Sequence, residues 1–242
     1  GKIAGIETLI LDLSDNGGGL MHQAVDLADY FLPKGVVITS TEGRAVQTTQ
    51  YISKQEQEFD GRLIVIINQN SASGSELVAG ALQDWDRAIV VGRNSYGKGL
   101  VQREIPLGDG SAIRLTIARY HTPSGRVIQR PFELGHKEDY AKAYVERLRK
   151  MVSNTDSLSL DSVEMPRFNT LLRGRTIYGG GGIIPDVRVA VDTTRLNSYA
   201  SQITARGVNV DFVVEYMDNN REKLAQQYPT FEQFDSEFVL SD

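Results

Sequence analysis

The sequence predicts an α/β fold that carries an added antiparallel element, and three observations support this prediction. Short apolar runs alternate with segments of helical periodicity up to about residue 92. Two further strand-like runs are joined by Leu107-Gly108-Asp109-Gly110, a turn sequence typical of a hairpin. The chain has 242 residues and 40% hydrophobic content, so it is long enough to bury a sizeable core.

The elements of the core follow in order along the chain. Strands are predicted at residues 8–13, 63–67 and 88–92. The run at 63–67, Leu-Ile-Val-Ile-Ile, is typical of a strand that is buried on both faces. Apolar residues recur at helical spacing after Met21 and again after Ser75, which predicts a helix behind the first strand and another behind the second.

The second part of the chain is less regular. Residues 99–106 and 111–122 form the predicted hairpin. A charged segment at residues 136–152 predicts a helix with a solvated face, and residues 153–162 have the composition of a polar linker.

A serine cluster occupies the predicted junction between the strand at 63–67 and its helix. Ser71, Ser73 and Ser75 all lie there. Free backbone N–H groups at a helix N-terminus can hold a developing negative charge, which favours a nucleophile at this junction without saying which serine it is. Serines are also ordinary capping residues, so a purely structural role is the alternative.

The base for such a serine is not predicted to be a histidine. His22, His121 and His136 are the only histidines, and none lies in a serine or acid motif of a known triad family. Lys98, in Gly97-Lys98-Gly99, is the candidate, although a lone Gly-Lys-Gly is usually a solvated turn. A lysine serves as a base only where desolvation lowers its pKa from about 10.4 toward 7 to 8. No Asp or Glu occurs between residues 95 and 101, which is compatible with that requirement.

The sequence gives no reason to expect a cofactor or a metal. It has no cysteine and no close His/Asp/Glu spacing that would indicate a metal site. The loop Gly17-Gly18-Gly19 fits neither a dinucleotide-binding nor a Walker pattern. Net charge is −5 and the pI about 5.3, so nucleic acid is not an expected partner.

Four stretches of the chain resemble the carboxyl-terminal processing peptidases, also called tail-specific proteases. In that family the nucleophile falls on Ser73, the base on Lys98 and a glutamine that supports the base on Gln102. The resemblance places the oxyanion donors at Gly74 and at Gly18 or Gly19. The stretches that carry the resemblance are residues 9–19, 71–84, 92–102 and 120–126.

The sequence departs from the family at two positions. Ser14 stands where the family more often has arginine, which puts a supporting contact of the glycine loop in doubt. Gly74 stands where alanine is more common, a change that keeps the backbone N–H. If residues 98–102 were fully extended, Lys98 and Gln102 would lie roughly 13 Å apart, so we expect a bend at the glycines that flank Lys98.

The resemblance also implies a domain organisation and a setting. It divides the chain into a core with a fold related to ClpP and crotonase at residues 1–130, an insertion at 131–178, a return strand at 179–191 and a helical extension at 192–242, with helical patterning at 196–204 and 210–224. We expect the chain to be a fragment whose full-length form has an upstream PDZ domain. The resemblance implies an exported enzyme of the periplasm or cell envelope. It leaves open whether the protein is an oligomer.

The resulting expectation is a serine endopeptidase that acts on polypeptides with free C-termini. Two alternatives from other classes stay open. One is a non-catalytic peptide- or lipid-binding module of the same fold, which an exposed Lys98 far from Ser73 would favour. The other is a crotonase-like acyl-CoA enzyme, which would not need Ser73.

Overall fold

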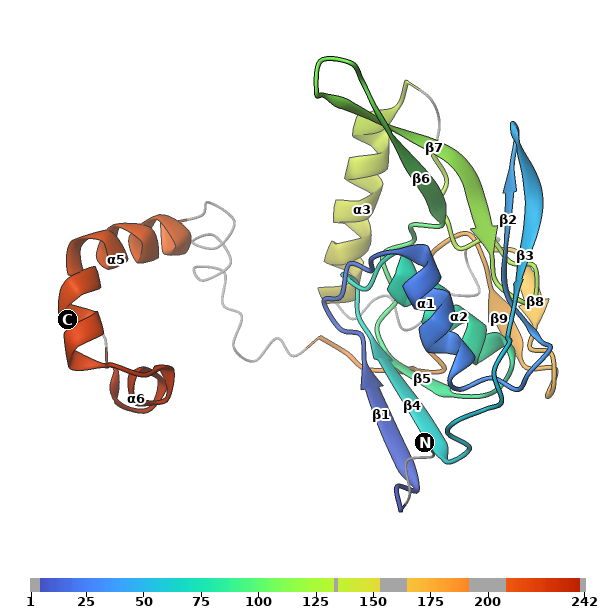
Figure 1. Cartoon of the computed structure of the whole chain (residues 1–242), viewed down its shortest axis with the longest axis horizontal. Helices are drawn as coiled ribbons and strands as arrows, with labels where there is room; N and C mark the ends of the chain where they lie inside the picture. Colours follow the sequence, from blue (N-terminus) through green and yellow to red (C-terminus); the bar gives the residue numbers. More distant parts are fainter. Residues whose placement is uncertain (1–4, 133–134, 153–164, 192–207, 240–242) are drawn as a thin grey trace. The chain divides into compact units, whose positions relative to one another are not determined.

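The computed structural model describes residues 5–132, 135–152, 165–191 and 208–239. The chain forms two compact units, Gly1–Val191 and Asp192–Asp242 (Figure 1). In the second unit the helices are α5 (Val208–Gln227) and α6 (Phe231–Glu237). The predicted linker at 153–162 and the helical patterning at 196–204 lie outside the described residues. None of the helices in the described ranges is long and apolar enough to cross a bilayer.

The first unit contains a parallel sheet with the strand order β1-β4-β5-β10. The strands expected at residues 8–13, 63–67 and 88–92 are confirmed, and helices follow the first and second of them as predicted. The bounds are β1 (Thr8–Asp12), α1 (Met21–Asp29), β4 (Arg62–Ile67), α2 (Gly74–Asp84), β5 (Ile89–Gly92) and β10 (Val187–Arg188).

The prediction that β4 is buried on both faces is wrong for the described part of the chain. Leu63, Val65 and Ile67 are at most 4% exposed, whereas the alternating Ile64 and Ile66 are only half-buried. Successive side chains of a strand point to opposite faces, and the hydrophobic core that contains α1 and α2 takes up one of these faces. The core therefore sits between the helices and one side of the sheet.

A second, antiparallel sheet has the strand order β3-β2-β7-β6. Its strands are β2 (Val37–Gly43), β3 (Val46–Ile52), β6 (Leu100–Pro106) and β7 (Ala112–His121). The predicted hairpin is confirmed as β6–β7, and β6 is an edge strand of this sheet. The hairpin β2–β3 was not predicted, so the expected alternation of strand and helix is wrong between α1 and β4. Its second strand, Val-Gln-Thr-Thr-Gln-Tyr-Ile, is largely exposed and lacks an apolar run that would reveal it.

The segment predicted as an insertion contains the expected helix and an unexpected hairpin. The helix is α3 (Lys137–Val152), and β8 (Arg167–Asn169) pairs with β9 (Thr176–Tyr178). The return strand predicted at 179–191 is reduced to the two residues of β10, which pair with β5. Gly180 and Gly182 have φ values of 78° and 88°, and such left-handed conformations interrupt an extended strand.

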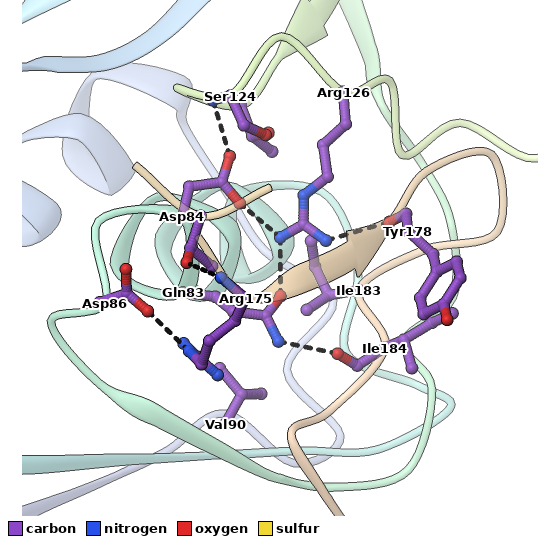
Figure 2. A network of polar contacts seen from close by, with 12 residues as sticks. Gln83, Asp84, Asp86, Val90, Ser124, Arg126, Arg175, Tyr178, Ile183 and Ile184 are labelled. Carbon is purple, nitrogen blue, oxygen red and sulfur yellow. Dashed lines mark hydrogen bonds and ion pairs between the residues drawn. The ribbon is translucent and has the colours of Figure 1, made fainter. Parts of the chain in front are cut away.

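Helix α2 is buried along its whole length, and its C-terminal end is fixed by a polar network (Figure 2). Asp84 and Arg126 form an ion pair at 2.7 Å, and both side chains are completely buried. Arg126 also donates to Gln83 Oε1 at 2.7 Å and to the Tyr178 carbonyl at 3.0 Å. The Ser124 amide donates to the second oxygen of Asp84. Asp84 therefore has a structural role at the end of the helix.

Arg175, which directly precedes β9, extends this network. Its Nε lies 2.6 Å from Asp86, just beyond α2, and its Nη1 lies 2.5 Å from Asp186, just before β10. Asp186 in turn accepts hydrogen bonds from Gln83 Nε2 and from the Val90 amide. Hydrogen bonds and ion pairs thus connect the C-terminal end of α2 to the segments that carry β9 and β10. This anchoring fixes the position of the opposite end of the helix.

Candidate active site

Ser73 lies on the turn between β4 and α2, and its backbone conformation is unusual. It precedes the first helical residue and has φ 56° and ψ −116°. Non-glycine residues rarely adopt a positive φ, and such outliers gather at functional sites. A sharp turn of this kind lifts the side chain out of the line of the chain. The half-buried Ser73 lines a pocket at the N-terminal end of α2.

The structure separates the three serines of the cluster. Ser71 Oγ is buried and donates to the Leu13 carbonyl at 2.6 Å. Ser75 Oγ lies 2.9 Å from Asn16 Oδ1 and so ties α2 to the glycine loop. Of the three, Ser73 is the serine that lines the pocket.

The pocket has a volume of about 380 Å³ and brings together most of the predicted site residues. Ser73, Lys98 and Gln102 all line it, with Gly74 and Gly19. Gly18 is the predicted site residue that does not line it. The remaining lining residues are Leu20, Met21, Leu77, Leu100, Val101, Arg114 and Tyr120. The walls are therefore a mixture of apolar side chains and a few polar groups, as in most ligand sites.

The two candidate glycines of the loop have different surroundings. Gly18 has φ 82°, and a Cβ atom there would lie 2.5 Å from both Ala72 O and Gly74 N. Its N–H donates to Asn16 Oδ1 at 2.9 Å. Gly18 therefore packs closely against the turn that carries Ser73, and its N–H already has an acceptor. Gly19, by contrast, lines the pocket.

The glycine loop is held by amide side chains. Asp15 accepts hydrogen bonds from Asn70 Nδ2 at 2.7 Å and from Asn68 Nδ2 at 2.9 Å, and these bonds lower the pKa of the carboxyl group. The Asp15 N–H donates back to Asn68 Oδ1. Ser14, which replaces the expected arginine, donates its N–H to Asp12. Asn68 and Asn70 thus hold the loop at Asp15.

Glu76 connects the turn that carries Ser73 (the serine turn) to the loop at residues 93–99 that carries Lys98 (the lysine loop). This contact was not predicted from the sequence. Its completely buried carboxylate accepts hydrogen bonds from the N–H groups of Ser73 (2.9 Å) and Lys98 (2.8 Å) through Oε2. Oε1 accepts from the Gly97 N–H at 2.7 Å and from Ser95 Oγ at 2.5 Å. Burial raises the pKa of Glu76 above its ordinary value, and the four donors oppose this effect.

The signal for this contact was present in part. Ser73 and Glu76 have the Ser-x-x-Glu spacing of a capping box, which predicts the bond from Glu76 to the Ser73 amide. The bonds to Gly97 and Lys98 cross more than twenty residues of sequence. Residues 95–101 contain no carboxylate, so this stretch of sequence gives no sign of the contact with Glu76.

Tyr120 provides a second link between the same two segments. Its buried Oη lies 2.8 Å from the Ser73 carbonyl oxygen and 2.8 Å from the Lys98 carbonyl oxygen. Burial, together with the charge of Glu76, raises the pKa of Tyr120 well above its ordinary value. The hydroxyl therefore stays protonated and donates to these carbonyls.

The predicted bend around Lys98 is confirmed. Gly97 has φ 90°, and β6 begins only at Leu100. A register shift between Val101 and Gln102 marks a β-bulge, a feature that redirects side chains. Lys98 and Gln102 consequently line one pocket although four positions separate them.

Comparison of the sequence with models of protein families identifies the family of this chain. The sequence model of peptidase family S41 matches residues 2–141, more than half of the chain. The chain belongs to peptidase family S41. A second model, a family of unknown function designated DUF8443, matches residues 199–242.

Curated relatives of this S41 chain carry names that refer to C-terminal processing. It is 47% identical over 121 residues to a carboxy-terminal-processing protease of Bartonella bacilliformis and 40% identical over 119 residues to a carboxyl-terminal-processing protease of Synechocystis sp.. These matches cover 50% and 49% of the chain but only 28% of each relative. The chain thus spans less than a third of the length of these relatives.

A solved structure supports the fold assignment. The photosystem II D1 C-terminal processing protease superposes with a TM-score of 0.52 and 26% identity, over 77% of this chain and 35% of that one. The mixed α/β fold of the S41 chain, with its parallel and antiparallel sheets, is thereby placed among proteins of this family.

The histidines of the S41 chain lie elsewhere. His22 is exposed on α1, His121 Nε2 lies 3.5 Å from the exposed Glu42, and His136 pairs with Asp139 on the surface. No histidine is among the described residues that line the pocket. The described part of the chain also has no cluster of three or more His, Cys, Asp or Glu residues that could hold a metal ion.

Proposed function

We propose that this chain is the proteolytic core of a serine endopeptidase that cleaves polypeptides near their C-termini. The observation that carries the proposal is the common pocket of Ser73 and Lys98 at the N-terminal end of a buried helix. The names of the S41 relatives supply the direction toward C-terminal processing.

Ser73 and Lys98 divide the chemistry between them. The Ser73 hydroxyl attacks the scissile carbonyl carbon while Lys98, in its neutral form, accepts the hydroxyl proton. The tetrahedral intermediate collapses to an acyl-enzyme, and Lys98 returns the proton to the departing amine. Water then attacks the ester with Lys98 again as the base, which restores the serine. Gln102 orients the amine through a neutral amide group, so it adds no counter-charge.

Backbone amides stabilise the oxyanion in this mechanism. Gly74 is the first residue of α2, where N–H groups have no partner within the helix. Gly19 lines the same pocket from the glycine loop. We assign the two oxyanion donors to Gly74 and Gly19 rather than Gly18, because the Gly18 N–H already donates to Asn16.

The edge strand β6 provides a place for the substrate backbone. The Leu107 N–H donates to Ser111 O, so alternation along the ladder directs the backbone groups of Gln102 and Glu104 toward the open edge. An extended peptide can pair with such an edge. The apolar walls at Met21, Leu77 and Leu100 suit an apolar substrate side chain.

The setting of the reaction stays a prediction from the family resemblance. We infer polypeptide substrates with free C-termini, an upstream PDZ domain in the full-length protein, and a location in the periplasm or cell envelope. The mechanism itself uses no cofactor.

The proposal is tested with the full chain, Ser73→Ala and Lys98→Ala, each incubated with an unfolded protein that ends in apolar residues. Mass spectrometry follows the fragments. We expect cleavage by the wild-type chain and a loss of about 10⁴-fold or more in both variants, with unchanged circular dichroism spectra. Cleavage that survives Ser73→Ala would point to the crotonase-like alternative. Binding of the peptide without cleavage by any of the three would favour the non-catalytic module.

A further inference from the structure

Helix α3 contacts the loop that carries Lys98, although most of the helix lies beyond the family match, which ends at residue 141. Arg147 Nη2 donates to the Ser95 carbonyl at 2.8 Å. Tyr144 Oη donates to the Gln69 carbonyl at 3.2 Å. Ser95 is the residue whose hydroxyl binds Glu76, so α3 reaches one end of the lysine loop directly.

A cage of three tyrosines around Arg130 forms the centre of this contact. The guanidinium carbon lies 4.2 Å from the ring centroid of Tyr140 and 4.7 Å from those of Tyr96 and Tyr144. Tyr96 belongs to the lysine loop, whereas Tyr140 and Tyr144 belong to α3. Arg130 is 7% exposed, and its Nε and Nη2 have no hydrogen-bond partner among the residues that the structure describes. The faces of the three rings therefore stabilise this buried charge through cation–π contacts.

Arg130 and its neighbour also hold the loop backbone on either side of Lys98. The Arg130 N–H donates to the Gly97 carbonyl at 3.1 Å, and the Gly99 N–H donates to Gln129 Oε1 at 3.0 Å. A Cβ atom on Gly97 would lie 2.5 Å from Arg130 Cγ, which shows how closely the two segments pack. The lysine loop is thus bound by Glu76 on one side and by the Gln129–Arg130 segment and α3 on the other.

One face of α3 makes all of these contacts. Tyr140, Tyr144 and Arg147 have the i, i+4, i+7 spacing that places side chains on the same side of a helix. Residues elsewhere on the helix are exposed, including Lys142, Val145 and Arg149. The helix is therefore attached mainly through the lysine loop and its neighbours. Its contacts add to those that Glu76 and the Gln129–Arg130 segment make with the loop, so loss of this face would leave the loop with fewer restraints.

We propose that α3 is a positioning element for the reaction: Tyr140, Tyr144 and Arg147 hold the lysine loop so that Lys98 is directed at Ser73. The catalytic part of this inference rests on the proposed function. Because α3 contacts the loop from outside the pocket, its loss should displace the base without changing the walls that bind substrate.

The test compares Tyr144→Ala and Arg147→Ala with matched controls in the full chain. Arg149→Ala makes the same substitution on the exposed side of α3, where Arg149 pairs only weakly with Glu146 at 3.9 Å. Tyr144→Phe keeps the ring of the cage and removes only the hydroxyl. Arg147→Lys keeps a donor at the same place. Two readouts are taken: peptide cleavage kinetics, and amide hydrogen exchange of the segment at residues 95–99.

We expect Tyr144→Ala and Arg147→Ala to lower kcat by about tenfold to a hundredfold and to change KM by less than about twofold, because a small displacement of a catalytic group is costly. Exchange at residues 95–99 should rise in both. Arg149→Ala should resemble the wild-type chain. Tyr144→Phe should keep most of kcat because the ring remains, and Arg147→Lys should recover part of kcat.

Exchange at residues 95–99 that matches Arg149→Ala would overturn the inference, whether or not the chain cleaves peptides. Faster exchange with unchanged kcat would also overturn it. Failure of the proposed function has a different signature: a wild-type chain that does not cleave, with the exchange difference between Arg147→Ala and Arg149→Ala still present. That difference alone would support the structural hold of α3 on the loop.

Discussion

The two ends of helix α2 each carry a completely buried carboxylate, but the groups that satisfy these carboxylates differ. Asp84, at the C-terminal end, pairs with the cation Arg126. Glu76, at the N-terminal end, accepts three backbone N–H groups and one hydroxyl, all of them neutral. The end that anchors the helix therefore uses ion pairs. The end that forms the pocket uses neutral donors, which occupy both carboxylate oxygens.

Removal of the cation at the anchoring end should have the largest effect. Arg126→Met would leave Asp84 buried without a counter-charge, and we expect the free energy of unfolding to fall by about 3–5 kcal/mol. Chemical denaturation measures this loss. Asp84→Leu combined with Arg126→Met should recover most of it, since no buried charge then remains. A single variant that unfolds like the wild-type chain would remove the distinction between the two ends.

Conversion of the other carboxylate should act on catalysis. Glu76→Gln places an amide N–H₂ group where the Lys98, Gly97 or Ser73 N–H groups need an acceptor. We expect kcat to fall by about a hundredfold, because the segments that carry Ser73 and Lys98 lose a shared support. Asp86→Asn makes the same exchange at the anchoring end and should leave the kcat of the folded protein close to wild type. Equal losses in the two variants would contradict the division of roles.

The Tyr120 hydroxyl should contribute less. Tyr120→Phe removes the donor shared by the Ser73 and Lys98 carbonyls, and we expect kcat to fall by about tenfold, in line with the modest net contribution of a neutral hydrogen bond. Tyr178→Phe is the control, because Tyr178 serves the anchoring network through its backbone carbonyl. Steady-state kinetics separate the two. A Tyr120→Phe variant with wild-type kcat would show that this hydroxyl is not needed to link the two segments.

The smallest effect is expected at Arg175. Its side chain is 31% exposed, so solvent weakens the pairs with Asp86 and Asp186. We expect Arg175→Ala to lower the free energy of unfolding by about 1 kcal/mol without changing kcat. Thermal unfolding in low and high salt measures it, and the difference from wild type should shrink as salt increases. A loss as large as that of Arg126→Met would mean that solvent exposure does not determine how much each arginine contributes to the free energy of unfolding.

Short sequence patterns predicted those strands, helices and turns that neighbouring residues determine. The apolar run of β4, the helical spacing of apolar residues after Ser75, and the Gly-Asp-Gly turn of the β6–β7 hairpin each indicated the observed element. The family resemblance supplied the candidate residues, and the structure brings Ser73, Lys98, Gln102, Gly74 and Gly19 to one pocket.

The parts that were missed depend on contacts distant in sequence or on elements without an apolar signature. The polar strand β3 has no run that distinguishes it from a loop. The bond between Glu76 and Lys98 joins residues 22 positions apart, and the cage around Arg130 joins three segments. Tertiary pairing decides such features, and a window of neighbouring residues does not contain it.

The left-handed backbone of Ser73 has a consequence for the choice of an inactive variant. A non-glycine residue in such a conformation costs on the order of 1–3 kcal/mol, which the surrounding structure must offset. Ser73→Ala keeps this unfavourable torsion, whereas Ser73→Gly relieves it. The glycine variant should therefore melt at a higher temperature than the natural chain, and the difference would measure how much thermal resilience the molecule gives up in order to present its serine.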